Sequence, residues 1–238
     1  MRSRGTGWIK WVPMHKADPF RLLLLNPNTS ARMTALAAAA LRERLGSAVA
    51  VLEMTAPFGA PVVASRASFA VAAHAALMGY EAFSAPHDAV LLACFGDPGL
   101  EALREVASVK VIGLAETAIL RAAAAGRKFA ILTVGRPWVR MLEETVLLLG
   151  AQAHCVEVFA LNGSGLDALR DQDAMAKKLN ALAKDAAKAG AEAAILGGVA
   201  LAGYAARLRP VLDYVDCLDA AAAAIQDEAV LHARVGTK

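Results

Sequence analysis

The sequence predicts an α/β protein made of two similar lobes, each with a parallel β-sheet. Short apolar runs alternate with long alanine-rich amphipathic segments from residue 21 onward. The short runs are apolar at successive positions, which is typical of strands that helices cover on both faces. The second half also repeats the first, because "AVLLACFGDPGL" and "AAILGGVALAGY" match at a constant offset of 104 residues. We therefore expect two pseudo-symmetric Rossmann-like lobes with an active-site cleft between them.

The first lobe opens with the strand "RLLLLN", which Pro27 ends, and Thr29 or Ser30 can cap the helix that follows. Residues 31–45 carry apolar side chains at helical spacing and are predicted to form that helix. The same patterns predict further strands at 48–54, 88–96 and 109–116, and helices at 67–83 and 117–126.

The second lobe starts the series again at residue 128. Strands are predicted at 128–134, 153–161, 191–198 and 213–219, and helices at 138–150, 173–190, 203–208 and 220–230. The final helix is expected to return to the first lobe. Lobe one would then comprise residues 20–125 plus 214–238, lobe two residues 126–213, and residues 1–19 a disordered extension.

The composition limits the classes of function to be considered. The 238 residues are 57% hydrophobic and 20% charged, and a chain of this length and composition can form one large domain or two lobes with hydrophobic cores. The net charge of +3 is small and its basic residues are scattered, which argues against a nucleic-acid partner. Three separated cysteines favour a reducing compartment over disulfides or zinc. No run reaches the ~20 apolar residues of a membrane span, so we expect a cytoplasmic protein with no membrane partner.

Cys94 is the main candidate for chemistry. It follows a buried strand and precedes the glycine-rich "FGDPG", so its thiol is expected at the strand's carboxyl end, where open parallel sheets bind ligands. Free backbone N–H groups there can lower the pKa of a thiol and hold developing negative charge. Under the offset of 104, Cys94 corresponds to Gly198, which would face it across the ligand. The alternative is a buried, inert thiol.

Three stretches resemble the Asp/Glu/hydantoin racemase superfamily, and hydantoin racemases most of all: "LNPNTS", "ACFGDPGL" and "ILGGVALAG". The similarity runs from about residue 20 to the C-terminus. It implies inversion of 5-substituted hydantoins or allantoin by two cysteines without a cofactor. Cys94 would be one acid/base. The expected substrate-binding residues are Asn26, Phe95, Gly96, Thr133, Gly197, Gly198 and Val199, where Thr133 is the pseudo-symmetric partner of Asn26.

One departure from that family affects the mechanism. Its two-cysteine members carry the second thiol where this chain has Gly198, so the two-thiol reaction is not available as written. Three readings follow. The chain is an isomerase with an unidentified second group, a one-cysteine decarboxylase or lyase that protonates one face of an enolate, or a non-catalytic binder of small carboxylates or imides. A decarboxylase branch of the superfamily works with one cysteine, although it keeps the second-lobe thiol and lacks the first.

Other residues are weaker candidates. Asp219 could reach the cleft from a strand end, but we favour a cap of the final helix. Thr117 either contacts ligand or caps a helix that begins at Ala118. Cys217 is interpreted as a packed strand thiol and Asp97 as a helix cap. There is no GxGxxG after the first strand and no P-loop, and neither metal nor organic cofactor is implied. The expected partners are a small-molecule substrate and further copies of the chain, because the alanine-rich helices could pack between subunits.

Overall fold

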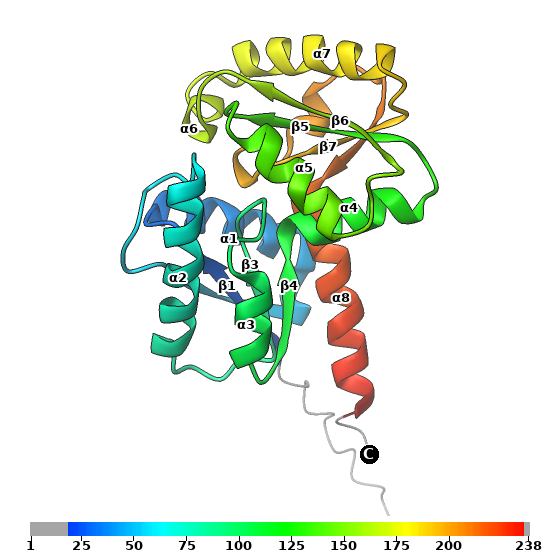
Figure 1. The fold of residues 1–238 in the computed structure, drawn as a ribbon. Coiled ribbons are helices and arrows are strands. Elements are labelled where there is room, and N and C mark those ends of the chain that lie inside the picture. The colour runs from blue at the N-terminus through cyan, green and yellow to red at the C-terminus, as the bar shows by residue number, and fades with distance from the viewer. Residues whose placement is uncertain (1–18, 236–238) are drawn as a thin grey trace, which may run out of the picture.

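Two four-stranded parallel sheets form the framework of the protein (Figure 1). The computed structural model describes residues 19–235. The strand order is β2-β1-β3-β4 in the first sheet and β6-β5-β7-β8 in the second, so the two lobes share one topology. The predicted α/β fold with paired parallel sheets is thereby confirmed. Apart from Pro19, the expected extension of residues 1–19 lies outside the described residues.

The elements alternate along the chain as the hydrophobic pattern predicts. Those of the first half are β1 (Phe20–Asn26), α1 (Ala31–Leu45), the 3-10 helix η1 (Gly46–Ala48), β2 (Val49–Thr55), α2 (Arg66–Ala82), β3 (Ala89–Leu92), α3 (Leu100–Val106), β4 (Lys110–Gly113) and α4 (Leu114–Ala124). Those of the second half are β5 (Phe129–Val134), α5 (Trp138–Leu148), β6 (Cys155–Leu161), α6 (Gly165–Ala168), α7 (Gln172–Lys188), β7 (Ala193–Leu196), the 3-10 helices η2 (Val199–Leu201) and η3 (Tyr204–Arg207), β8 (Asp213–Asp216) and α8 (Cys217–Val235).

The central strands are buried on both faces, which explains their unbroken apolar sequences. The side chains of Leu22–Leu25 in β1 and of Phe129–Leu132 in β5 have no exposed surface. One hydrophobic cluster contains side chains from both strands, together with residues of α4 and α8. Because the lobes share this core, it fixes their relative position, and with it the space between their strand ends.

Helices α4 and α8 tie the lobes together. α4 leaves the first sheet and packs against β7 and β8 of the second, while α8 leaves β8 and packs against α1, β3 and β4 of the first (Figure 1). The two helices also pack along each other. Within residues 19–235, no helix is both long enough and apolar enough to cross a membrane.

Both connecting helices begin three residues earlier than the sequence predicts. Residues 214–216, which we assigned to lobe one, pair with β7 as part of β8, so the chain leaves lobe two only at Cys217. Carboxylates from neighbouring segments explain the early starts, since they accept hydrogen bonds from the first N–H groups of each helix. Asp97 accepts from the backbone of Ala115 and Glu116, and Asp216 accepts from the backbone of Leu218.

Candidate active site

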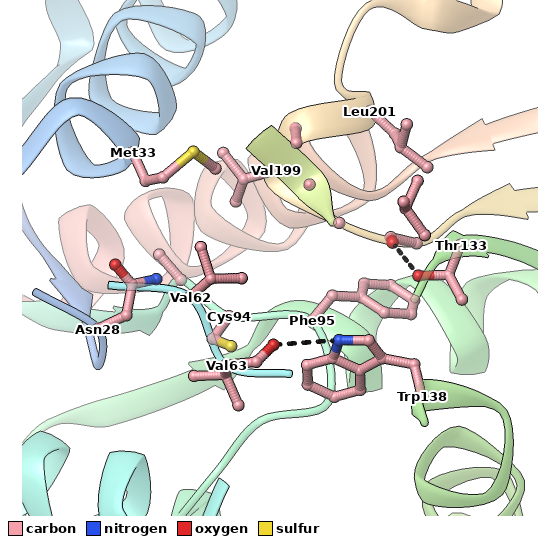
Figure 2. Close-up of a pocket in the computed structure, with 16 residues that line it drawn as sticks. Asn28, Met33, Val62, Val63, Cys94, Phe95, Thr133, Trp138, Val199 and Leu201 are labelled. Carbon is pink, nitrogen blue, oxygen red and sulfur yellow. Dashed lines mark hydrogen bonds between the residues drawn. The ribbon is translucent and has the colours of Figure 1, made fainter. Parts of the chain in front are cut away.

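An open pocket lies where the strand ends of the two lobes face each other, and its space of about 640 Å³ includes the solvent at its mouth (Figure 2). Its wall is formed by Asn28, Met33, Val62, Val63, Ala93, Cys94 and Phe95 of the first lobe and by Thr133, Val134, Trp138, Gly165, Gly197, Gly198, Val199, Ala200 and Leu201 of the second. The position follows from the topology, because the carboxyl ends of parallel strands gather at one edge of a sheet. Six of the predicted site residues therefore come together here: Cys94, Phe95, Thr133, Gly197, Gly198 and Val199.

Cys94 lies in the turn after β3 and is 9% exposed. Burial, followed by the negative charge of Asp97, raises the pKa of its thiol to about 12. This is opposite to the direction that the sequence predicts, because burial and the Asp97 charge both disfavour the thiolate. The thiol is therefore protonated at neutral pH, and in that state it is a proton donor to the pocket.

The turn that carries Cys94 depends on tight contacts at two glycines. Gly96 has φ of +119°, and a Cβ there would lie 2.6 Å from Cζ3 of Trp138. Gly96 is predicted to bind substrate, but it is not among the residues that line the pocket. Its missing side chain instead leaves room for the Trp138 ring over the turn. A Cβ on Gly197 would lie 2.8 Å from Cε1 of Phe95, so glycine lets this ring reach the second lobe. Figure 2 shows the Phe95 ring between Cys94 and Thr133.

The second lobe offers the pocket no thiol. Gly198 has φ of +138°, which an L-residue rarely adopts, and a Cβ built on it would meet no atom within 4 Å. The position that would carry a second cysteine is therefore open toward the ligand. The neighbouring Thr133 hydroxyl donates to the carbonyl oxygen of Gly197 at 2.9 Å, which fixes the turn from behind (Figure 2).

Asn26 does not line the pocket, and Asn28 does. The Asn26 amide donates to Asn28 Oδ1 at 3.0 Å, to the carbonyl of Ser30 at 3.2 Å and to Thr34 Oγ1 at 3.0 Å. It therefore holds the loop that presents Asn28. Both asparagines belong to the stretch that carries the family resemblance, so only the fold of the loop distinguishes them.

The weaker candidates lie away from the pocket wall. Thr117 is in the first turn of α4 rather than before the helix, and its hydroxyl donates to the carbonyl of Gly113 at 2.8 Å. Asp219 is not the cap of α8. Its side chain is 63% exposed and its Oδ1 accepts from Nε of Arg44 at 2.5 Å, while Asp216 bonds the start of the helix.

Cys217 is the first residue of α8 rather than a strand residue, and it is fully buried. Burial raises the pKa of its thiol, although the backbone N–H groups of Gly198 and Leu218 act in the opposite direction. At the offset of 104 it corresponds to Gly113, so at these two pairs of equivalent positions each lobe has one cysteine and one glycine, in exchanged order. Among the described residues that line the pocket, Cys94 is consequently the only one with a titratable side chain.

The apolar wall is the part of the site that sequence analysis missed. Val62 and Val63 come from the irregular segment between β2 and α2, which has no periodic pattern, and Met33 comes from the first turn of α1. Trp138 begins α5, where the sequence gives no sign that its ring turns toward the first lobe. Within residues 19–235, no three His, Cys, Asp or Glu side chains gather so that they could hold a metal ion.

Two contacts hold the Val62–Val63 segment and the start of α2 against α5. Trp138 Nε1 donates to the carbonyl of Val63 at 3.2 Å (Figure 2). Arg66 pairs with Glu144 at 2.5 Å. The first bond is buried and the second is exposed. Net contributions are about 1 kcal/mol for a buried hydrogen bond and between zero and about 1 kcal/mol for an exposed ion pair.

Trp138→Phe is therefore expected to loosen the pocket while keeping its apolar surface. We expect a loss of about 1 kcal/mol in the free energy of unfolding, because the Val63 carbonyl loses its buried donor. Substrate affinity should fall by about two- to tenfold for the same reason. Urea unfolding and ligand titration measure the two quantities. Arg66→Gln is the matched control between the same segments, and an equal or larger effect of that variant would show that the tryptophan bond does not hold the wall.

Comparisons with known proteins agree with this geometry. A family model described as Asp/Glu/Hydantoin racemase matches residues 22–227. The hydantoin racemase of Paenarthrobacter aurescens is 30% identical over 205 residues, which cover 82% of this chain and 86% of that protein. The hydantoin racemase of Rhizobium meliloti is 38% identical over 135 residues, 54% of this chain and 56% of that protein. The allantoin racemase structure from Pseudomonas fluorescens superposes with a TM-score of 0.82 at 27% identity, covering 91% of this chain and 92% of that one.

Proposed function

Because the chain belongs to the Asp/Glu/hydantoin racemase family, we propose that it inverts the C5 centre of 5-substituted hydantoins or closely related imides, without a cofactor and with Cys94 as acid/base. The observation that carries the proposal is the single titratable side chain in a pocket whose wall is otherwise neutral. A thiol at a strand end is placed where a ligand between the lobes would present its acidic carbon.

The wall favours a neutral substrate with an apolar substituent. None of the described lining residues is Lys, Arg or His, so a carboxylate bound here would lose its hydration without gaining a counter-charge. Met33, Val62 and Trp138 offer an apolar surface to an alkyl or aromatic group on C5. Asn28 and the backbone of the Gly197–Gly198 turn offer hydrogen-bond partners to an imide ring. We therefore favour an alkyl or aryl hydantoin over allantoin, whose C5 substituent is a polar ureido group.

The proton can be followed through the reaction. The Cys94 thiolate takes the C5 proton on one face, and the adjacent C4 carbonyl group takes up the electron pair left on carbon as an enolate. Water on the open side near Gly198 gives a proton to the opposite face. The Cys94 thiol then returns its proton to the hydroxide so formed, and the ring is released inverted. Because the thiol pKa is about 12, the thiolate fraction and the rate should rise about tenfold per pH unit from pH 8 to 10.

Gly198 favours a second candidate function. With one thiol and no side chain on the opposite wall, the site could protonate a single face of an enolate left by bond cleavage, as a lyase or decarboxylase does. That reaction yields one product enantiomer, whereas a racemase yields both.

Proton exchange in D₂O tests these readings. Each enantiomer of 5-benzylhydantoin, and of allantoin for comparison, is incubated with the protein while NMR follows deuterium at C5 and chiral chromatography follows configuration. Exchange with inversion above the spontaneous rate, faster for 5-benzylhydantoin, is the expected result. Exchange with retention would favour the one-face lyase. No exchange above the background, with binding intact, would leave a non-catalytic binder.

A further inference from the structure

Asp97 has an unusual conformation and environment for a charged residue. It is 7% exposed and, among residues 19–235, it is the only non-glycine residue with a positive φ, at 54°. The left-handed conformation is unfavourable for an L-residue, because it brings Cβ close to the following carbonyl oxygen. Surrounding contacts must therefore hold Asp97 in place.

Those contacts join the Cys94 turn to α4. Asp97 Oδ1 accepts from the backbone of Ala115 at 3.0 Å, and Oδ2 accepts from the backbone of Glu116 at 2.7 Å. The backbone N–H of Asp97 donates to the carbonyl oxygen of Cys94 at 2.9 Å. A Cβ on Gly113 would lie 2.6 Å from Asp97 Oδ2, so this glycine leaves room for the carboxylate. The thiol turn and the first turn of the bridging helix thus form one unit.

The charges around Asp97 come from three segments. Glu116 of α4 faces it with a like charge and is itself paired with Arg104 of α3 at 2.5 Å. The Cys94 thiol lies on the same turn as Asp97. Burial raises the pKa of Asp97 to about 7 in spite of the backbone N–H groups that it accepts from. The carboxyl is therefore ionised above the neutral range, where it opposes a second negative charge on sulfur.

We propose that Asp97 is the positioning residue of Cys94: its carboxylate fastens the thiol turn to α4, and its negative charge adds to the effect of burial in disfavouring the thiolate. The proposal rests on the proposed function only where it concerns the role of Cys94 in turnover. The structural unit and its effect on the thiol are properties of the free protein. They can be measured without any substrate.

The pH dependence of Cys94 alkylation by iodoacetamide, followed on the Cys94 peptide by mass spectrometry, is the direct test. Asp97→Asn removes the charge and keeps one acceptor oxygen. We expect the midpoint of the profile to fall by about one pH unit, so that alkylation becomes about tenfold faster between pH 8 and the midpoint, where the wild-type carboxyl is ionised, and stays unchanged below pH 6. Asp97→Ala should also raise the alkylation rate on the plateau above the midpoint, because the Cys94 turn loses its hydrogen bonds to the backbone of α4. Asp171→Asn is the matched control, since Asp171 caps α7 through Ala174.

The wild-type protein gives an independent test if the variants fail to fold. The logarithm of its alkylation rate should rise with unit slope below pH 6 and above pH 8, and more slowly between them. The slope falls there because ionisation of Asp97 raises the affinity of the thiol for its proton. A constant slope, or a midpoint unchanged in a folded Asp97→Asn protein, would overturn the proposal. Absence of hydantoin turnover would instead count against the proposed function alone.

If turnover is found, Asp97→Asn should move the rising limb of the kcat profile, which follows the thiolate fraction, to lower pH by the same amount and leave KM unchanged. A purely structural role would instead change KM and stability without moving the profile.

Discussion

Cys94→Ala is expected to lower enzyme-dependent exchange of the C5 proton to the spontaneous background. The loss should be about a thousandfold, because general acid–base catalysis by a placed side chain contributes roughly 10²–10⁴. No other described lining residue can titrate in its place, since the rest of the wall is apolar, amide, hydroxyl or backbone. Deuterium incorporation into 5-benzylhydantoin measures the effect. Removal of one buried sulfur at the turn should leave ligand affinity within a few-fold.

Cys217→Ala is the matched control for this result. It removes a second buried thiol of the same core cluster, and this thiol does not line the pocket. Exchange should stay within about twofold, with a stability loss of about 1 kcal/mol, typical of a core substitution. If Cys94→Ala kept full exchange, or Cys217→Ala lost it, the assignment of the proton carrier would be wrong.

The fold could be predicted from sequence because its determinants are local or repeated. Buried parallel strands show unbroken apolar runs, and the offset between Cys94 and Gly198 places equivalent turns at equivalent strand ends. The turn residues Phe95, Gly197 and Val199 lie at the pocket for that reason. Where the location of a residue depends only on the order of the strands, it could be predicted from the sequence.

The rest of the site depends on contacts between residues far apart in sequence. Asp97 accepts a hydrogen bond from the first turn of α4, although it lies 18 residues before Ala115 in the sequence, and no local sequence pattern predicts a cap over that distance. Asp219 appeared to end a strand only because the start of α8 was predicted too late. The direction of the Cys94 pKa shift required knowledge of its burial and of the Asp97 charge beside it.

The exchanged thiols of the two lobes suggest how the chain differs from a two-thiol racemase. In lobe one, Cys94 lines the pocket and Gly113 is the last residue of β4. In lobe two, Gly198 lines the pocket and Cys217 directly follows β8. Under the proposed function, the pocket offers an acid/base to one face of the substrate and leaves the other face open. Inversion by the wild-type protein would then use solvent for one of the two proton transfers.

Gly198→Cys is expected to supply the missing proton carrier. There is room for the side chain, because a Cβ at this position meets nothing within 4 Å, but φ of +138° makes any L-residue strained. We expect a loss of about 1–3 kcal/mol in the free energy of unfolding from this backbone strain. In a folded protein, a thiol on the second face should raise the ratio of inversion to retention in D₂O at least tenfold, since a placed acid/base outperforms bound water.

Gly198→Ala separates strain from chemistry, because it adds the same Cβ on the same backbone without a thiol. It should lose as much stability as Gly198→Cys and gain no inversion. Equal inversion ratios in the two variants would mean that position 198 does not face the reacting carbon, and that water is not the group limiting the second face. A gain confined to Gly198→Cys would place C5 between residues 94 and 198. The wild-type chain would then be a racemase whose second proton transfer is left to solvent.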